Sequence, residues 1–191
     1  MKNLIKAIIM LFVLATATGT HAAEKYGFQT VPFGTSYEDV SIYLLEKYGV
    51  QPPLMPMETL TLSSFDLSGV PVDIIFRFTA EAKFYGFSIH PPERDIEAIR
   101  TVEGDAAFLA GMLKKKYGNK YTCKDFSILL TGRTICDWIH PDLRIFTALV
   151  GQRKHNYTVV AFISSKKYSK QFVEQKQRER EKQEKAAADR F

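Results

Sequence analysis

The chain has 191 residues, with 26 lysine and arginine residues against 21 aspartate and glutamate residues. The basic surplus lies outside the body of the chain, because residues 23–165 carry 15 basic and 16 acidic side chains, whereas residues 166–191 carry nine and five. A nearly neutral body lacks the basic face that nucleic-acid binding requires, so we expect no nucleic-acid partner. The length suits one domain.

The N-terminus has the features of a secretory signal peptide. Lys2 and Lys6 precede a short apolar run, and small residues surround the Ala22–Ala23 bond. The run is shorter than the roughly twenty apolar residues that a membrane span needs. We therefore expect residues 1–22 to be cleaved off, and the mature chain, which then has no transmembrane span, to be periplasmic or secreted.

The first predicted helix begins near Thr35, which has Glu38 three residues later, the spacing of a capping box. Apolar side chains recur along it at helical spacing, and Gly49 is placed to end it. Three strands are predicted next, at 59–67, 70–79 and 82–90. In the second of them, apolar positions alternate with positions that are on the whole more polar, as in an antiparallel sheet covered on one side.

A second helix is predicted over 95–117, because apolar residues are spaced by three and four throughout it. Gly104 is a weak helix former, so a break near 103–105 is an open alternative. Strands are then predicted at 133–140, 143–151 and 156–164, with a shorter extended piece near 121–126.

The two predicted helices end in the same pattern, L-x-x-K-Y-G, at residues 44–49 and 113–118. Strand-rich sequence follows each copy. This predicts two tandem helix-then-strand repeats, at about 30–91 and 95–165, which share the two-layer helix and sheet core of an α+β domain spanning 23–165.

Residues 166–191 form a charged tail with few apolar residues. Good helix formers with mixed charges indicate a projecting helix or a disordered segment. Its cations could hold the protein weakly on anionic surfaces, which would make it a surface-attached structural protein, or the tail could serve only solubility.

Cys123 and Cys136 are the two cysteines of the chain. An even number of cysteines in an exported protein favours a disulfide, and no C-x-x-C motif indicates redox chemistry. We therefore predict that the two residues are bonded to each other.

His90 and His140 each occur in an Ile-His-Pro sequence at the end of a predicted strand, and each is followed by an acid, Glu93 or Asp142. One hypothesis joins the four residues in a metal-dependent hydrolase site. The alternative is that His-Pro only ends a strand. Neither histidine has the local spacing of a metal site, and the chain has no nucleophile elbow or phosphate-binding glycine loop. We expect no catalytic residue, metal or cofactor.

The pattern F-G-T-S-x-E-D-V at 33–40, together with the two helices that end K-Y-G, resembles a broad group of exported bacterial α/β-repeat proteins. This group contains the beta-lactamase inhibitor protein and the small lipoprotein of outer-membrane β-barrel assembly. The resemblance implies the fold, and it implies a function exerted by presenting a surface to another protein. We therefore expect a non-enzymatic module that binds another envelope protein through the exposed sheet face or its loops.

Overall fold

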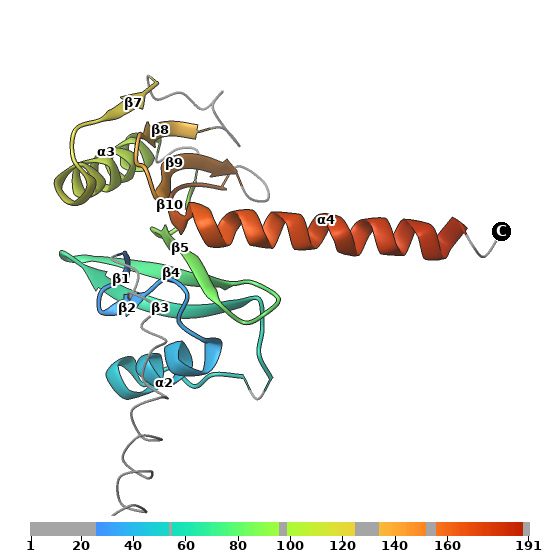
Figure 1. Ribbon diagram of the computed structural model, residues 1–191. Coiled ribbons are helices and arrows are strands. Elements are labelled where there is room, and N and C mark those ends of the chain that lie inside the picture. The colour runs from blue at the N-terminus through green and yellow to red at the C-terminus, as the bar shows by residue number, and fades with distance from the viewer. Residues whose placement is uncertain (1–25, 54, 96–98, 125–133, 152–155, 189–191) are drawn as a thin grey trace, which may run out of the picture.

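A computed structural model describes residues 26–188 of the chain, apart from 54, 96–98, 125–133 and 152–155. The described residues form an α+β structure with three helices and a large antiparallel sheet (Figure 1). In chain order the elements are β1 (Gly27–Phe28), β2 (Val31–Pro32), α2 (Tyr37–Tyr48), β3 (Thr59–Leu67), β4 (Val70–Phe78), β5 (Phe84–His90), β6 (Arg94–Asp95), α3 (Ile99–Tyr117), β7 (Tyr121–Cys123), β8 (Thr134–Trp138), β9 (Leu143–Gly151), β10 (Asn156–Ser165) and α4 (Lys166–Ala188).

The large sheet has the strand order β3-β4-β5-β10-β9-β8-β7, and β6 also pairs with β10. The strands before α3 and those after it therefore meet where β5 pairs with β10, with Ile89 opposite Ala161. β1 and β2 form a separate two-stranded sheet. All these pairs are antiparallel.

One buried cluster combines α2, α3, β1, β2 and one face of the large sheet. Leu44 of α2, Leu109 of α3, Phe76 of β4 and Ile145 of β9 are all fully buried in it. The alternation predicted for β4 is confirmed, since Val72, Ile74, Phe76 and Phe78 are buried while Asp73 is exposed. We call the face that carries the other set of side chains the outer face.

The predicted start of the first helix is wrong by one residue. The N-cap is Ser36, whose Oγ accepts a hydrogen bond of 3.1 Å from the backbone N–H of Asp39. Thr35 instead donates its hydroxyl to the carbonyl oxygen of Pro32, at 2.8 Å. The hydroxyl of Thr35 is therefore already used in the preceding turn, and its neighbour caps the helix.

The second helix also differs from the prediction over 95–117. Arg94 and Asp95 pair with β10, and the helix is observed from Ile99 to Tyr117. It runs through Gly104 without a break. A Cβ at Gly104 would have no neighbour within 4 Å, so this position lies on an uncrowded surface of the helix. The short strand before the helix was not predicted.

The strand predictions are confirmed, with shifted ends. β3 and β9 have the predicted bounds, while β4, β5 and β8 are shorter than predicted and β10 includes Ser165. The extended piece predicted near 121–126 is observed as Tyr121–Cys123, and its end lies outside the described residues.

The predicted disulfide is confirmed. Cys123 on β7 lies directly opposite Cys136 on β8, and their sulfur atoms are 2.05 Å apart. The bond joins the edge strand of the sheet to its neighbour.

The tail is helical over Lys166–Ala188, and it projects from the body as α4 (Figure 1). Its first turns contact the outer face of the sheet, where the ring of Phe172 stacks on Tyr85 with a centroid distance of 5.1 Å. Farther along α4, Lys176 Nζ forms an ion pair with Glu58 Oε1 at 2.7 Å. None of the described helices combines the length and the apolar composition that a membrane crossing requires.

Candidate functional site

The strand register places two arginines from distant parts of the chain in one row of the outer face. Arg77 on β4 is opposite Gly86 on β5, Gly86 is opposite Ser164 on β10, and Ser164 is opposite Arg144 on β9. Gly86 and Ser164 in the middle of the row are small, so the surface is hollowed between the two arginine side chains. A Cβ at Gly86 would lie 2.6 Å from the Cβ of Ser164, which shows how closely β5 and β10 approach.

The neighbouring row supplies two aromatic rings. Phe162 on β10 is opposite Phe146 on β9, and their rings stack with centroids 4.8 Å apart and planes inclined by 17°. The guanidinium carbon of Arg77 lies 5.6 Å from the ring centroid of Phe162, and that of Arg144 lies 5.1 Å from the ring centroid of Phe146. These distances are those of cation–π contacts, which hold each guanidinium over a ring.

Helix α4 forms the wall of a groove above these two rows. The groove has a volume of about 330 Å³, and its described lining contains no carboxylate. We call it the arginine groove, and its lining residues are Arg77, Tyr85, Gly86, Phe87, Arg144, Phe146, Phe162, Ile163, Ser164, Ser169, Phe172 and Val173.

The cations of the arginine groove have no acidic partner within the described part of the chain. No ion pair there involves Arg77 or Arg144. The Nε of Arg77 and the Oγ of Ser169 are buried and make no hydrogen bond. A buried donor without an acceptor costs free energy, about 1–3 kcal/mol. The groove thus contains two buried donors that lack a hydrogen-bond partner among the described residues.

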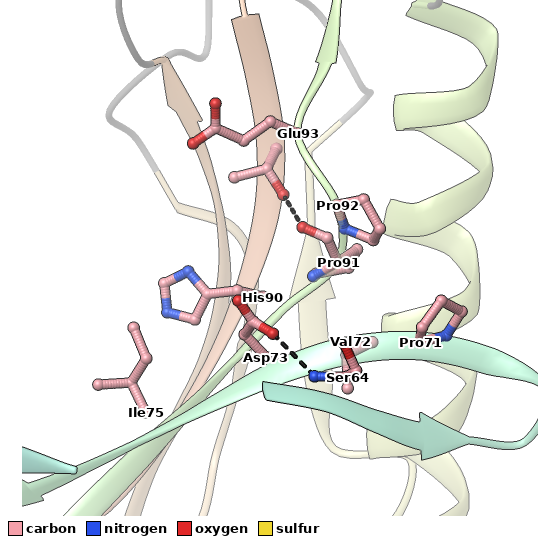
Figure 2. A pocket seen from close by; sticks show the side chains of 10 residues that line it. Ser64, Pro71, Val72, Asp73, Ile75, His90, Pro91, Pro92 and Glu93 are labelled. Atoms are coloured by element: carbon pink, nitrogen blue, oxygen red, sulfur yellow. Dashed lines mark hydrogen bonds between the residues drawn. The ribbon is translucent and has the colours of Figure 1, made fainter. Parts of the chain in front are cut away.

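A second hollow, of about 470 Å³, lies beside β4 and β5 (Figure 2). His90 and Glu93 both line it, so the structure brings these two predicted residues to one pocket. Asp73 is opposite His90 across the strands, and its Oδ1 accepts a hydrogen bond of 3.0 Å from the backbone N–H of Ser64.

The imidazole of His90 is held neutral near pH 7. Burial and, to a lesser extent, the positive charge of Arg77 lower the pKa of His90 to about 4, although the carboxylate of Asp73 opposes the shift. The Nε2 of His90 lies 2.7 Å from the Oγ of Ser88. The charge of Arg77, which lines the arginine groove, therefore acts on the imidazole of His90 in the neighbouring pocket.

Ser88, His90 and Asp73 have the residue types of a hydrolytic triad but not its accessibility. The side chain of Ser88 is fully buried, so its hydroxyl cannot reach a substrate. The carboxylate oxygen of Asp73 that makes a described hydrogen bond accepts from Ser64 and not from the imidazole. Ser88 and His90 therefore form a structural hydrogen-bonded pair, and Asp73 lies opposite His90 on the next strand.

The structure does not bring His140 to His90. The Nδ1 of His140 accepts hydrogen bonds from the backbone N–H groups of Asp142 and Leu143, at 3.2 and 3.1 Å, and its ring packs on Tyr26 with centroids 4.9 Å apart. His140 is therefore fixed in its own turn, together with Asp142.

The two Ile-His-Pro corners lie at opposite ends of β10. The carbonyl oxygen of Pro91 accepts a hydrogen bond from Thr158, near the start of β10, whereas that of His140 accepts one from Lys166, just after its end. Thr158 and Lys166 are eight residues apart, which corresponds to about 26 Å along an extended strand. Among the described residues no group of three histidine, cysteine, aspartate or glutamate side chains could hold a metal ion.

Sequence reasoning missed both arginines of the arginine groove as site residues. The available signal was local, since Arg144-x-Phe146 places a cation and a ring on the same face of one strand. What could not be read was the pairing with Arg77, which depends on three strand registers.

No protein-family model, no curated protein and no solved structure matched the chain. The fold and the site therefore define the protein in general terms, as an α+β protein with an arginine and aromatic groove on the outer face of its sheet.

Proposed function

We propose that the protein is an exported, non-enzymatic binding module that holds an acidic segment of another envelope protein in the arginine groove. The observation that carries this proposal concerns Arg77 and Arg144, which are fixed over stacked phenylalanine rings. Among the residues that the structure describes, neither arginine has an acidic partner and the groove lining contains no carboxylate. The disulfide between Cys123 and Cys136 supports export, because such bonds persist in oxidising compartments.

The chemistry of the groove favours a peptide with carboxylates over a purely apolar partner. An arginine can bind a carboxylate through two parallel hydrogen bonds, and arginine and aromatic residues are frequent among the residues that dominate binding energy at interfaces. The rings of Phe146 and Phe162 provide the apolar contact between the two cations.

The spacing of the arginines indicates what such a segment looks like. Arg77 and Arg144 are three strand spacings apart, which is about 14 Å between their Cα atoms. An extended chain covers that distance in about four residues. A segment with two acidic residues about four positions apart, and an apolar residue between them, therefore matches both cations and the rings.

We also propose that the body consists of two helix-then-strand repeats, each of which supplies one of the arginines. The support is that Gly49 and Gly118, which end the two L-x-x-K-Y-G copies, both adopt positive φ angles, of 70° and 90°. Their backbone N–H groups donate to the carbonyl oxygens of Leu45 and Lys114. The two copies thus end their helices by the same left-handed geometry.

The groove can be tested with a short fluorescein-labelled peptide that has two glutamates about four residues apart and a central phenylalanine. We expect saturable binding by fluorescence anisotropy that weakens with added salt. The matched peptide with glutamine in place of both glutamates should bind more weakly by roughly thirtyfold, because it loses two charged contacts of about 1 kcal/mol each.

The double variant Arg77→Gln and Arg144→Gln should bind the two peptides equally weakly. Arg180→Gln, an exposed change on the projecting part of α4, is the matched control and should leave binding unchanged. If the double variant kept the preference for the glutamate peptide, the arginine groove would not be its binding site.

A further inference from the structure

A second groove, apolar in character, lies on the other side of the sheet, among the described residues between β1 and α3. It has a volume of about 540 Å³, within the range of roughly 300–1,000 Å³ that is common for small-molecule sites. Its floor is formed by Ile74, Phe87 and Ile163, from three neighbouring strands. Phe28 and Met112 belong to its opposite walls.

This groove becomes more polar from its floor to its mouth. Ile74, Phe87 and Ile163 are buried, whereas Met112 on the wall is only partly buried. Lys116, which lines the mouth with its neighbour in α3, is exposed. An apolar interior below a polar rim suits a ligand with a hydrocarbon body and a polar head.

The charge at the mouth has one sign. Lys115 and Lys116 line it, and no carboxylate occurs among the described lining residues. No ion pair within the described part of the chain involves either lysine. The Nζ of Lys116 lies 5.4 Å from the ring centroid of Tyr117. An anionic head group at this point would meet two cations without acidic competition.

We propose that this groove binds a single-chain amphiphile with a carboxylate head, of the long-chain fatty acid class. The hydrocarbon chain lies along Ile74, Phe87 and Ile163, and the carboxylate pairs with Lys115 and Lys116. This site does not depend on the arginine groove, because the two sites lie on opposite faces of the sheet and have only the floor residues Phe87 and Ile163 in common.

The probe for the test is dansyl-undecanoate, used below its micelle concentration with the purified protein. We expect saturable fluorescence enhancement at one site per chain, and displacement by dodecanoate. Dodecanol should displace the probe less well, by about fivefold, because it lacks the charged contact. The variant Lys115→Gln with Lys116→Gln should bind dodecanoate about fivefold more weakly and dodecanol unchanged.

Lys114→Gln is the matched control, because it removes a lysine of the same helix that does not line the groove. It should leave dodecanoate binding unchanged, and Arg77→Gln should do the same, which separates this site from the arginine groove. Met112→Trp should fill part of the groove with its larger side chain and abolish the binding of dansyl-undecanoate. The proposal is overturned if no saturable binding occurs, if Lys115 and Lys116 prove irrelevant to dodecanoate, or if the protein binds only vesicles of phosphatidylglycerol.

Discussion

Arg77 on β4 and Arg144 on β9 lie in one row of the sheet, with Gly86 and Ser164 between them. Because the two middle residues are the smallest in the row, the guanidinium groups can lean over Phe162 and Phe146 without filling the space between them. The open centre of the arginine groove therefore depends on the small size of two residues as much as on the charge of the other two.

Gly86→Ala should destabilise the protein. The added Cβ would lie 2.6 Å from the Cβ of Ser164 and 3.0 Å from the carbonyl oxygen of Ile163, so β5 and β10 must separate. Overpacking of this kind costs about 1–3 kcal/mol in unfolding free energy. Gly104→Ala should instead stabilise α3 by about 1 kcal/mol, since its Cβ meets no neighbour. Urea denaturation of both variants checks the opposite signs, and equal shifts in the same direction would contradict the prediction.

The stability of the protein should fall in acid partly because of His90. The pKa of His90 is lowered in the folded state to about 4 from an ordinary value of 6.5, so the unfolded chain binds the proton more readily. Its contribution is therefore complete above pH 6.5 and is lost as the pH falls toward 4. In His90→Gln this part of the pH dependence should disappear, as measured by urea midpoints across that pH range.

The same histidine reports on its charged neighbours. Arg77→Gln should raise the pKa of His90, because a nearby positive charge is removed, and Asp73→Asn should lower the pKa further. Titration of the imidazole proton resonance by NMR measures both shifts. An unchanged pKa in both variants would show that burial alone sets the protonation of His90.

Removal of the disulfide should destabilise the protein by about 3 kcal/mol, as expected for a closed loop of this length. The bond links residues separated by 13 positions, at the pair β7 and β8. The double variant Cys123→Ala and Cys136→Ala should show this loss in urea denaturation. The wild-type protein in reductant should match the variant, and a difference between the two would point to an effect of the substitutions themselves.

Phe172→Ala should loosen the base of α4, because the ring stacks on Tyr85 and is the aromatic contact of the helix with β5. Amide hydrogen exchange in the turns around Phe172 should become faster, while exchange in β9 and β10 stays the same. Val173→Ala is the matched control, since Val173 is 61% exposed. Equal acceleration in both variants would show that the stack does not hold the helix.

Local patterns in the sequence predicted local structure well. The alternation in β4 depends on neighbours in the chain, and it is observed. The N-cap was misplaced, because Thr35 and Ser36 are chemically similar, and only the position of the Pro32 carbonyl decides between them.

The candidate site was less predictable, because it depends on contacts between distant residues. His90 and His140 share the same local sequence, yet strand order places them at opposite ends of β10. Conversely, Arg77 and Arg144 share no motif, and strand order places them in one row. Charge and aromatic content can be read from the chain, but the register that combines them cannot.

The position of β10 has a consequence for how the protein reaches its folded state. This strand is the last of the sheet to be synthesised, yet it pairs with β5, β6 and β9. β5 therefore keeps one unpaired edge until residue 165 is available, and the closure joins residues far apart in the chain, which slows folding. Until that moment the growing chain exposes a strand edge that can pair with other chains, so protection during synthesis matters more here than for a sheet built only from sequence neighbours.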